Sequence, residues 1–316
     1  MLSSLANRLY WLGRNLERAE STARLLNVYS NLLLDLPDDA GIGWETLLRV
    51  TGAEEQASAP RRWELSNSVV RHLAADRENA NSIYSCVAVA RENMRTLREL
   101  VPREGFESVN DLYLFAQAKL GRQRYVRIRF TVLREVVQRC QQIHGLLAGN
   151  MSRGVAYSFI ELGRLIERAD MTTRIIDVAS EAQGSGEQMV SDHDAVIWIN
   201  VLRCASGYQM YRQSVRSRVT PVRVLHFLIN DLNFPRSVRY CLHGVRRGAE
   251  ALPRGELPVG AVDLLLEKMD NTPLRLLLRD ELNARLDDFQ VEMGNIHNAI
   301  SETWFEPYTE EELTEQ

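Results

Sequence analysis

One segment of the chain occurs twice, at a constant separation of 150 residues. Segments 12–28 and 162–178 are identical at nine of their seventeen positions, and four more positions exchange only Leu for Ile or Glu for Asp. Both segments begin with Leu-Gly-Arg and continue into Glu-Arg-Ala. Such self-similarity indicates a chain built from two copies of one unit, in which a functional site should use matched residues from both copies. We therefore predict an internal duplication.

The 316 residues suffice for one large domain or for two of ordinary size. The apolar pattern is interrupted near residue 150, where Gly149, Asn150, Ser152 and Gly154 occur close together. Weaker matches, such as Trp44 with Trp198 and Cys86 with Cys241, continue the repeat beyond its first segment. We predict two helical halves, 1–150 and 151–316, that pack together as one compact unit.

Apolar residues recur every three or four positions from Ser3 to Leu34, which is the period of an amphipathic helix. No segment shows the alternation of a strand. The same period predicts an all-α helical bundle with further helices near 42–52, 62–75, 81–101, 106–120, 123–148, 155–183, 192–206, 207–217, 220–230, 235–251, 258–269 and 273–304. Asn233 followed by Pro235 predicts a helix start, and Asn79 to Ser82 predicts the matching start in the first half.

Composition excludes several classes of protein. Hydrophobic residues make up 45% and charged residues 25% of the chain, as in ordinary globular proteins. The net charge of −4 gives no general attraction to nucleic acid or to an anionic membrane, and we interpret the basic stretch Arg122, Arg124, Arg127 and Arg129 as an exposed helix start rather than an RNA site. No signal peptide or membrane span is visible, so we expect a cytoplasmic protein whose four cysteines are reduced.

The repeated segment also carries a pattern of charges. On a helical wheel, Glu17, Glu20 and Arg24 form a polar strip beside Gly13, at the edge of the apolar face. The spacing of four favours intrahelical pairs of Glu20 with Arg24 and of Asp170 with Arg174, whereas Arg18 and Arg168 point toward other helices. The candidate groove or ion-pair network comprises Arg14, Glu17, Arg18, Glu20, Arg24, Arg164, Glu167, Arg168, Asp170 and Arg174.

Two interpretations of these strips remain open. They can form a structural network of ion pairs, which the pattern favours, or a site for a ligand, a metal or acid–base chemistry. Four carboxylates, Glu17, Glu20, Glu167 and Asp170, match the number in di-metal bundles, but the Glu-x-x-His spacing of those bundles is missing. The six histidines are scattered, and no nucleotide-binding loop or hydrolase elbow occurs. We expect no metal and no cofactor.

The motifs LGRNLERAE at 12–20 and LGRLIERAD at 162–170 resemble the Alpha-E family of bacterial proteins, all-helical proteins with a characteristic Glu-Arg motif. The resemblance extends over nearly the whole chain. It implies association with a circularly permuted ATP-grasp protein and a transglutaminase-like peptidase, in peptide synthesis or modification. The family pattern DP-x-NP-x-S falls on Asp76, Asn79 and Ser82 in the first half, where its prolines are missing.

The resemblance thus implies an accessory or scaffold subunit of an ATP-grasp-associated peptide synthesis or modification system. The alternative is an independent enzyme or ligand-binding protein that uses the paired acidic and arginine strips, with or without a metal. A scaffold should bury its carboxylates in arginine pairs, whereas an enzyme should leave them lining an accessible pocket.

Overall fold

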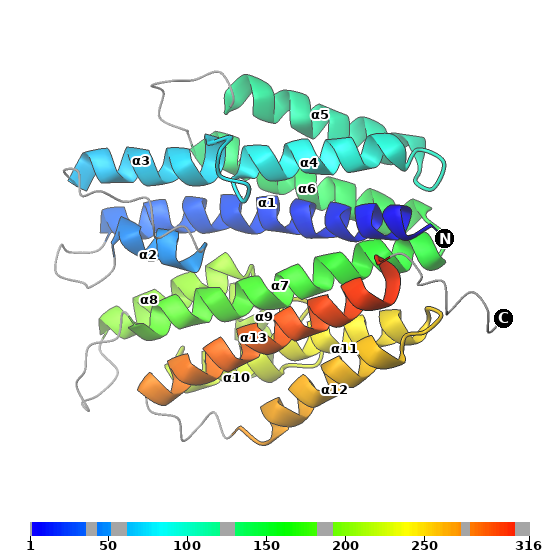
Figure 1. Cartoon of the computed structure of the whole chain (residues 1–316). Coiled ribbons are helices and arrows are strands. Elements are labelled where there is room, and N and C mark those ends of the chain that lie inside the picture. Colours follow the sequence, from blue (N-terminus) through cyan, green and yellow to red (C-terminus); the bar gives the residue numbers. More distant parts are fainter. Residues whose placement is uncertain are drawn as a thin grey trace.

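A computed structural model describes residues 2–35, 43–51, 62–120, 130–181, 192–272 and 279–306, and each regular element in these ranges is a helix (Figure 1). The first part of the chain forms α1 (Ser3–Asp35), α2 (Trp44–Val50), α3 (Arg62–Ala75), α4 (Ile83–Thr96), α5 (Arg103–Lys119) and α6 (Phe130–Asn150). The second part forms α7 (Val155–Glu181), α8 (Asp192–Cys204), α9 (Tyr208–Val215), α10 (Pro221–Asn230), α11 (Val238–Glu250), α12 (Glu256–Asp270) and α13 (Arg279–Trp304). The predicted all-helical class is confirmed.

Some predicted features lie outside the described residues. These are the basic stretch at 122–129 and parts of the predicted helices 42–52, 123–148, 155–183 and 273–304. Within the described part of the chain, the predicted helix 81–101 is too long, because α4 ends at Thr96 and α5 begins at Arg103. Pro102 lies immediately before α5 and disfavours a helical conformation at Val101, so the helix could not have continued to residue 101 as predicted.

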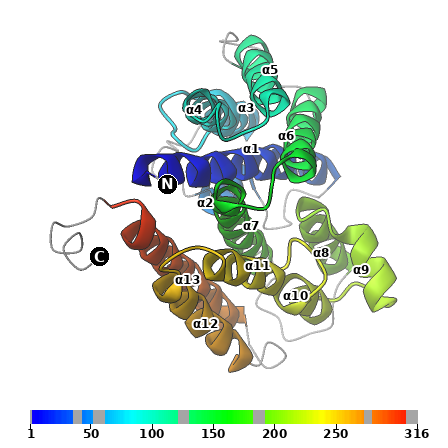
Figure 2. The same ribbon diagram turned by 90° about the vertical axis from the view of Figure 1, so that its right-hand side faces the viewer.

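Helices α1 and α7 cross and pack against each other at the centre of the bundle (Figure 2). Helices α4 and α6 pack on α1, with α5 outside them, while α11 and α13 pack on α7, with α12 outside them. Contacts also cross between the two parts of the chain, because α2 reaches α7 and α8 reaches α1. The buried apolar side chains form one continuous core, and the division into halves at residue 150 stays a prediction.

The matched helices α4 and α11 begin in the same way. The hydroxyl of Ser82 accepts a hydrogen bond from the backbone N–H of Ser85, and the hydroxyl of Ser237 accepts one from Tyr240. Serine is a favoured N-cap because it satisfies one of the free N–H groups of the first turn. The prediction that Asn233 and Pro235 start a helix was therefore wrong by a few residues. The missing prolines of the first half do not prevent the same cap.

Helices α1 and α7 touch through their backbones at two matched glycines. A Cβ atom on Gly13 would lie 2.1 Å from the carbonyl oxygen of Ile160, and one on Gly163 would lie 2.0 Å from that of Tyr10. Tyr10 and Ile160 are themselves separated by the repeat distance. These contacts leave no room for any side chain at either glycine.

All four cysteines are buried and unpaired, as expected for reduced thiols. Burial raises the pKa of Cys86 to about 12, which keeps its thiol protonated and unreactive. The described helices include none that is both long enough and apolar enough to cross a bilayer.

The crossing glycines give a first prediction. Gly13→Ala and Gly163→Ala should each lower the free energy of unfolding by about 3 kcal/mol or more, because the new methyl group meets backbone atoms that cannot rotate away. Gly294→Ala is the matched control, since a Cβ on this α13 glycine meets nothing within 4 Å. The control should stabilise by about 0.5–1 kcal/mol. Urea unfolding measures all three, and equal stabilities for the crossing variants and the control would contradict the close contact.

Candidate functional site

The two Glu-Arg dipeptides exchange partners across the crossing of α1 and α7. Arg168 donates from Nε to Glu17 Oε1 at 3.0 Å and from Nη2 to Glu17 Oε2 at 2.7 Å. Arg18 donates in the same way to Glu167, from Nε to Oε1 at 2.5 Å and from Nη2 to Oε2 at 2.9 Å. Each carboxylate therefore accepts a two-point hydrogen bond from the arginine of the other helix, the strongest geometry for this pair of groups.

Both carboxylates are buried and ionised. Burial raises the pKa of Glu17, but the guanidinium groups of Arg168 and Arg236 outweigh it and hold this pKa well below the usual range. Burial likewise raises the pKa of Glu167, and Arg14 and Arg18 outweigh it, so that this pKa is also lowered. Carboxylates in this state bind arginines but do not exchange protons near neutral pH.

Two further arginines complete the exchange. Arg14 donates from Nε to Glu167 Oε2 at 2.8 Å, and its guanidinium lies 5.3 Å from the centre of the Trp11 ring. Arg236, from the turn before α11, donates to Oε1 of Glu17 at 2.5 Å and to Oε1 of Glu20 at 2.8 Å. Burial lowers the pKa of Arg236 to about 10, and Glu17 and Glu20 offset this lowering only in part.

The pair of Glu20 and Arg24 forms as the spacing predicts, within α1. Oε1 of Glu20 accepts hydrogen bonds from Arg24 and Arg236 and one from Nε2 of Gln141, at 3.3 Å. Glu20 is fully buried. It therefore belongs to the same cluster as Glu17.

The second strip does not repeat this arrangement. Asp170 pairs with Arg174 at 2.9 Å, as predicted, but this pair is partly exposed and lies apart from the exchange. Arg164 pairs with Glu161 of its own helix and does not join the network. The two strips are thus unequal, with the larger cluster on the side of Glu17 and Glu20.

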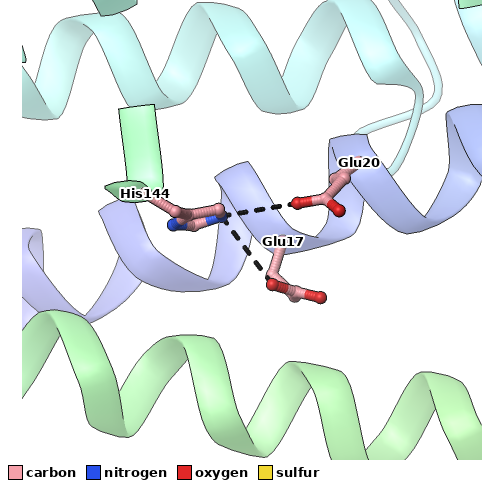
Figure 3. A group of neighbouring side chains, drawn as sticks. All are labelled: Glu17, Glu20 and His144. Atoms are coloured by element: carbon pink, nitrogen blue, oxygen red, sulfur yellow. Dashed lines mark ion pairs between the residues drawn. The ribbon is translucent and has the colours of Figure 1, made fainter. Parts of the chain in front are cut away.

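Sequence reasoning missed His144 of α6. Figure 3 shows its ring facing Glu17 and Glu20, with Nε2 at 3.7 Å and 3.8 Å from their Oε2 atoms. Burial lowers the pKa of His144 to about 4, because the two glutamates only partly offset it, and the imidazole is neutral at pH 7. Within the described part of the chain, neither His144 Nε2 nor Glu20 Oε2 has a hydrogen-bond partner.

Arg236 was also missed. No spacing rule connects it with Glu17, 219 positions away, or connects His144 with Glu20. One signal existed, since Arg236 matches Asn81 in the repeat, and Asn81 accepts a hydrogen bond from Arg18 at 2.5 Å. The turn before α4 therefore contacts the central Arg18, and the matched turn before α11 contacts the central Glu17 and Glu20.

Glu17, Glu20 and His144 offer ligand atoms within 4.8 Å of one another, and their types would suit a metal such as zinc. However, Arg24, Arg168 and Arg236 bind the same two carboxylates. Three positive charges already exceed two negative ones, and a divalent cation would add to this excess at short range. The charge balance does not favour a metal here, and its absence stays a prediction.

The architecture and the Glu-Arg exchange can be compared with known proteins. A family model described as "a predicted alpha-helical domain with a conserved ER motif", Alpha-E, matches residues 1–305. The chain belongs to the Alpha-E family. In this Alpha-E protein, the Glu-Arg dipeptides at 17–18 and 167–168 are the residues that bind each other across α1 and α7.

Three mycobacterial proteins are related to this Alpha-E protein. They are "Uncharacterized protein Mb2597" of Mycobacterium bovis and "Uncharacterized protein MT2643" and "Uncharacterized protein Rv2567" of Mycobacterium tuberculosis, each 21% identical over 92% of this chain. The match spans 35% of each relative, so this chain corresponds to about a third of their length. No solved structure matches the chain.

The exchange gives a second prediction. Glu17→Gln and Glu167→Gln should each lower the free energy of unfolding by about 3–5 kcal/mol, because each leaves a buried arginine without its counter-charge. Glu107→Gln breaks an exposed pair with Arg103 and serves as control, with an expected loss of about 0.5 kcal/mol or less. If urea unfolding shows losses for Glu17→Gln and Glu167→Gln no larger than that of the control, the exchange does not stabilise the fold.

The lowered pKa of His144 gives a third prediction. Between about pH 6.5 and 4 the unfolded chain binds a proton at this histidine and the folded chain does not, so stability should fall as the pH falls through this window. The groups that face His144 are Glu17 and Glu20 of α1 and Arg164 and Arg168 of α7.

His144→Gln should make this pH dependence shallower by up to about 1.4 kcal/mol per pH unit. Urea unfolding as a function of pH measures the slope. His226→Gln, at an exposed position of α10, is the control variant. An unchanged slope in His144→Gln would show that His144 titrates in the folded protein as it does in the unfolded chain.

Proposed function

We propose that this Alpha-E protein is a non-catalytic helical subunit or scaffold of a cytoplasmic peptide synthesis or modification system, acting with an ATP-grasp ligase. One observation carries the proposal: the charged groups of the Glu-Arg motif form ion pairs that join α1 to α7. Glu17 and Glu167 are almost completely buried and each is bound by arginines of the other helix. A site for substrate would present such groups in an accessible cleft.

The length of the mycobacterial relatives supports the same proposal. In each of them the matched region makes up 35% of the chain, so the helical unit occurs beside other sequence within one protein. A module of this kind works together with other domains or subunits. The identities of the partners, a circularly permuted ATP-grasp protein and a transglutaminase-like peptidase, come from the family resemblance.

A second candidate function is an independent ligand-binding protein or enzyme. The observation that favours it is the pair of unpartnered atoms, Glu20 Oε2 and His144 Nε2, since buried polar atoms are normally hydrogen-bonded. A ligand at this position would lie among side chains that are at least nine-tenths buried and would face Arg24, Arg168 and Arg236. A substrate would have poor access to a site in this place, and we rank this function second.

Affinity capture from native extract distinguishes the two functions. The tagged protein should co-purify with an ATP-grasp protein identified by mass spectrometry, in the presence or absence of ATP. The control is a parallel capture with the same tag on an unrelated helical protein. Recovery of the chain alone, with a stoichiometric metal or small molecule, would overturn the subunit proposal in favour of the second function.

A further inference from the structure

Residues 195–230 contain five arginines and neither aspartate nor glutamate. Because the whole chain has a net charge of −4, the rest of the molecule is correspondingly acidic. Four of these arginines, Arg212, Arg216, Arg218 and Arg223, are exposed and belong to α9, α10 and the turn between them. We call this surface the α9–α10 basic face.

The backbone of this face is held in place by hydrogen bonds. The hydroxyl of Tyr211, whose side chain is buried, donates to the carbonyl of Arg218 at 3.2 Å. Arg223 donates from Nη1 to the same carbonyl at 3.4 Å, which brings the arginines of the turn and of α10 together. Arg216 ends α9 with a left-handed φ of 48° and donates to the carbonyl of Gln213. Helix α9 lies at the outer edge of the molecule, with α10 beside it (Figure 2).

The arginines of this face have no acidic partner among the described residues. Among the residues that the structure describes, none of the four forms an ion pair with a carboxylate, whereas Arg103 pairs with Glu107 on α5. Exposed arginines commonly pair with nearby acids, but here the local sequence offers none. A guanidinium can bind a carboxylate through two parallel hydrogen bonds, so each of these side chains is available for such a contact.

Two exposed apolar side chains accompany the arginines. Met210 and Val222 are 44% and 43% exposed on the same two helices. Arginine and methionine are enriched at protein–protein interfaces, in which apolar contacts are combined with charged hydrogen bonds. Nucleic acid is a less suitable partner, because two of the three tyrosine and phenylalanine rings on α9 and α10, Tyr211 and Phe227, are buried and cannot stack on bases, and the third, Tyr208, is half-buried.

We propose that the α9–α10 basic face binds an acidic segment of a partner protein. The carboxylates of that segment would bind the four guanidinium groups, and an apolar side chain of the segment would cover Val222, which is next to Arg223 in α10. The inference rests on the proposed function for the identity of the partner, since the subunit would meet its ligase here. The capacity to bind an acidic peptide does not depend on it.

Binding of a fluorescein-labelled oligoglutamate peptide to the full chain, measured by fluorescence anisotropy at low salt, tests the face. The variant carries Arg212→Gln, Arg216→Gln, Arg218→Gln and Arg223→Gln. The matched control carries Gln at four other exposed arginines, Arg95, Arg103, Arg134 and Arg285, and so changes the net charge equally. The face variant should bind the peptide about tenfold more weakly or worse, and the control should bind like the parent.

Three results would overturn the proposal: no binding by the parent, equal losses in the two variants, or tighter binding of a single-stranded DNA of the same charge that is lost only in the face variant.

Capture of the ATP-grasp partner separates this inference from the proposed function. A partner that co-purifies equally with the parent and the face variant contradicts this docking site and leaves the proposed function intact. If the parent binds the peptide and the face variant does not, but no ATP-grasp protein is captured, the α9–α10 basic face binds acidic peptide and the proposed function is contradicted.

Discussion

The close contact of α1 with α7 determines the chemistry of everything around it. At Gly13 and Gly163 each helix places a carbonyl oxygen where a side chain would otherwise lie. Beside this contact, an arginine of each helix forms two hydrogen bonds with a glutamate of the other. Burying a charge costs several kcal/mol, about the same for a carboxylate and a guanidinium, and the cost is offset only when the paired geometry is good. The glycines and the Glu-Arg dipeptides therefore depend on each other. If the helices lay farther apart, the glutamates and arginines would be buried but poorly paired. If the glutamates and arginines did not pair, the close contact of the helices would bury unpaired charges.

The two sides of this exchange contain different residues but have the same net charge. On one side, Glu17 and Glu20 face Arg24, Arg168 and Arg236, and on the other, Glu167 faces Arg14 and Arg18. Each side therefore has one more positive charge than negative. His144 is neutral mainly because burial lowers its pKa; Glu17 and Glu20 offset this only in part, and Arg164 and Arg168 lower the pKa further. The same excess separates this cluster from the carboxylate-rich centres of di-metal helix bundles, which need net negative charge to hold their ions.

Much of the fold could be predicted from the sequence, because the period of the apolar residues is a local property that survives tertiary packing. The start of α4 at Ser82 falls within the predicted range Asn79 to Ser82, but the cap of α11 at Ser237 was missed, because several residues that can cap a helix stand close together there and packing decides among them. In the site, the pair of Glu20 and Arg24 was predictable from its spacing within one helix. The partners of Arg18 and Arg168 were not, since a helical wheel gives the direction of a side chain but not the neighbour it meets. Arg236 and His144 come from elements far along the chain, and only the fold brings them to Glu17.

The exchange of partners has a consequence for the origin of the chain. Arg18 finds its glutamate on α7, and Arg168 finds its glutamate on α1, so neither helix can neutralise its own motif. A protein that had a single helix of this kind would bury unpaired charges unless a second copy of the same chain docked against it. In such a pair, each copy would offer the other the same glutamate, the same arginine and the same glycine, which is the self-complementary contact of a symmetric dimer. The crossing of α1 and α7 places the same three residue types on both sides of the contact, within one polypeptide.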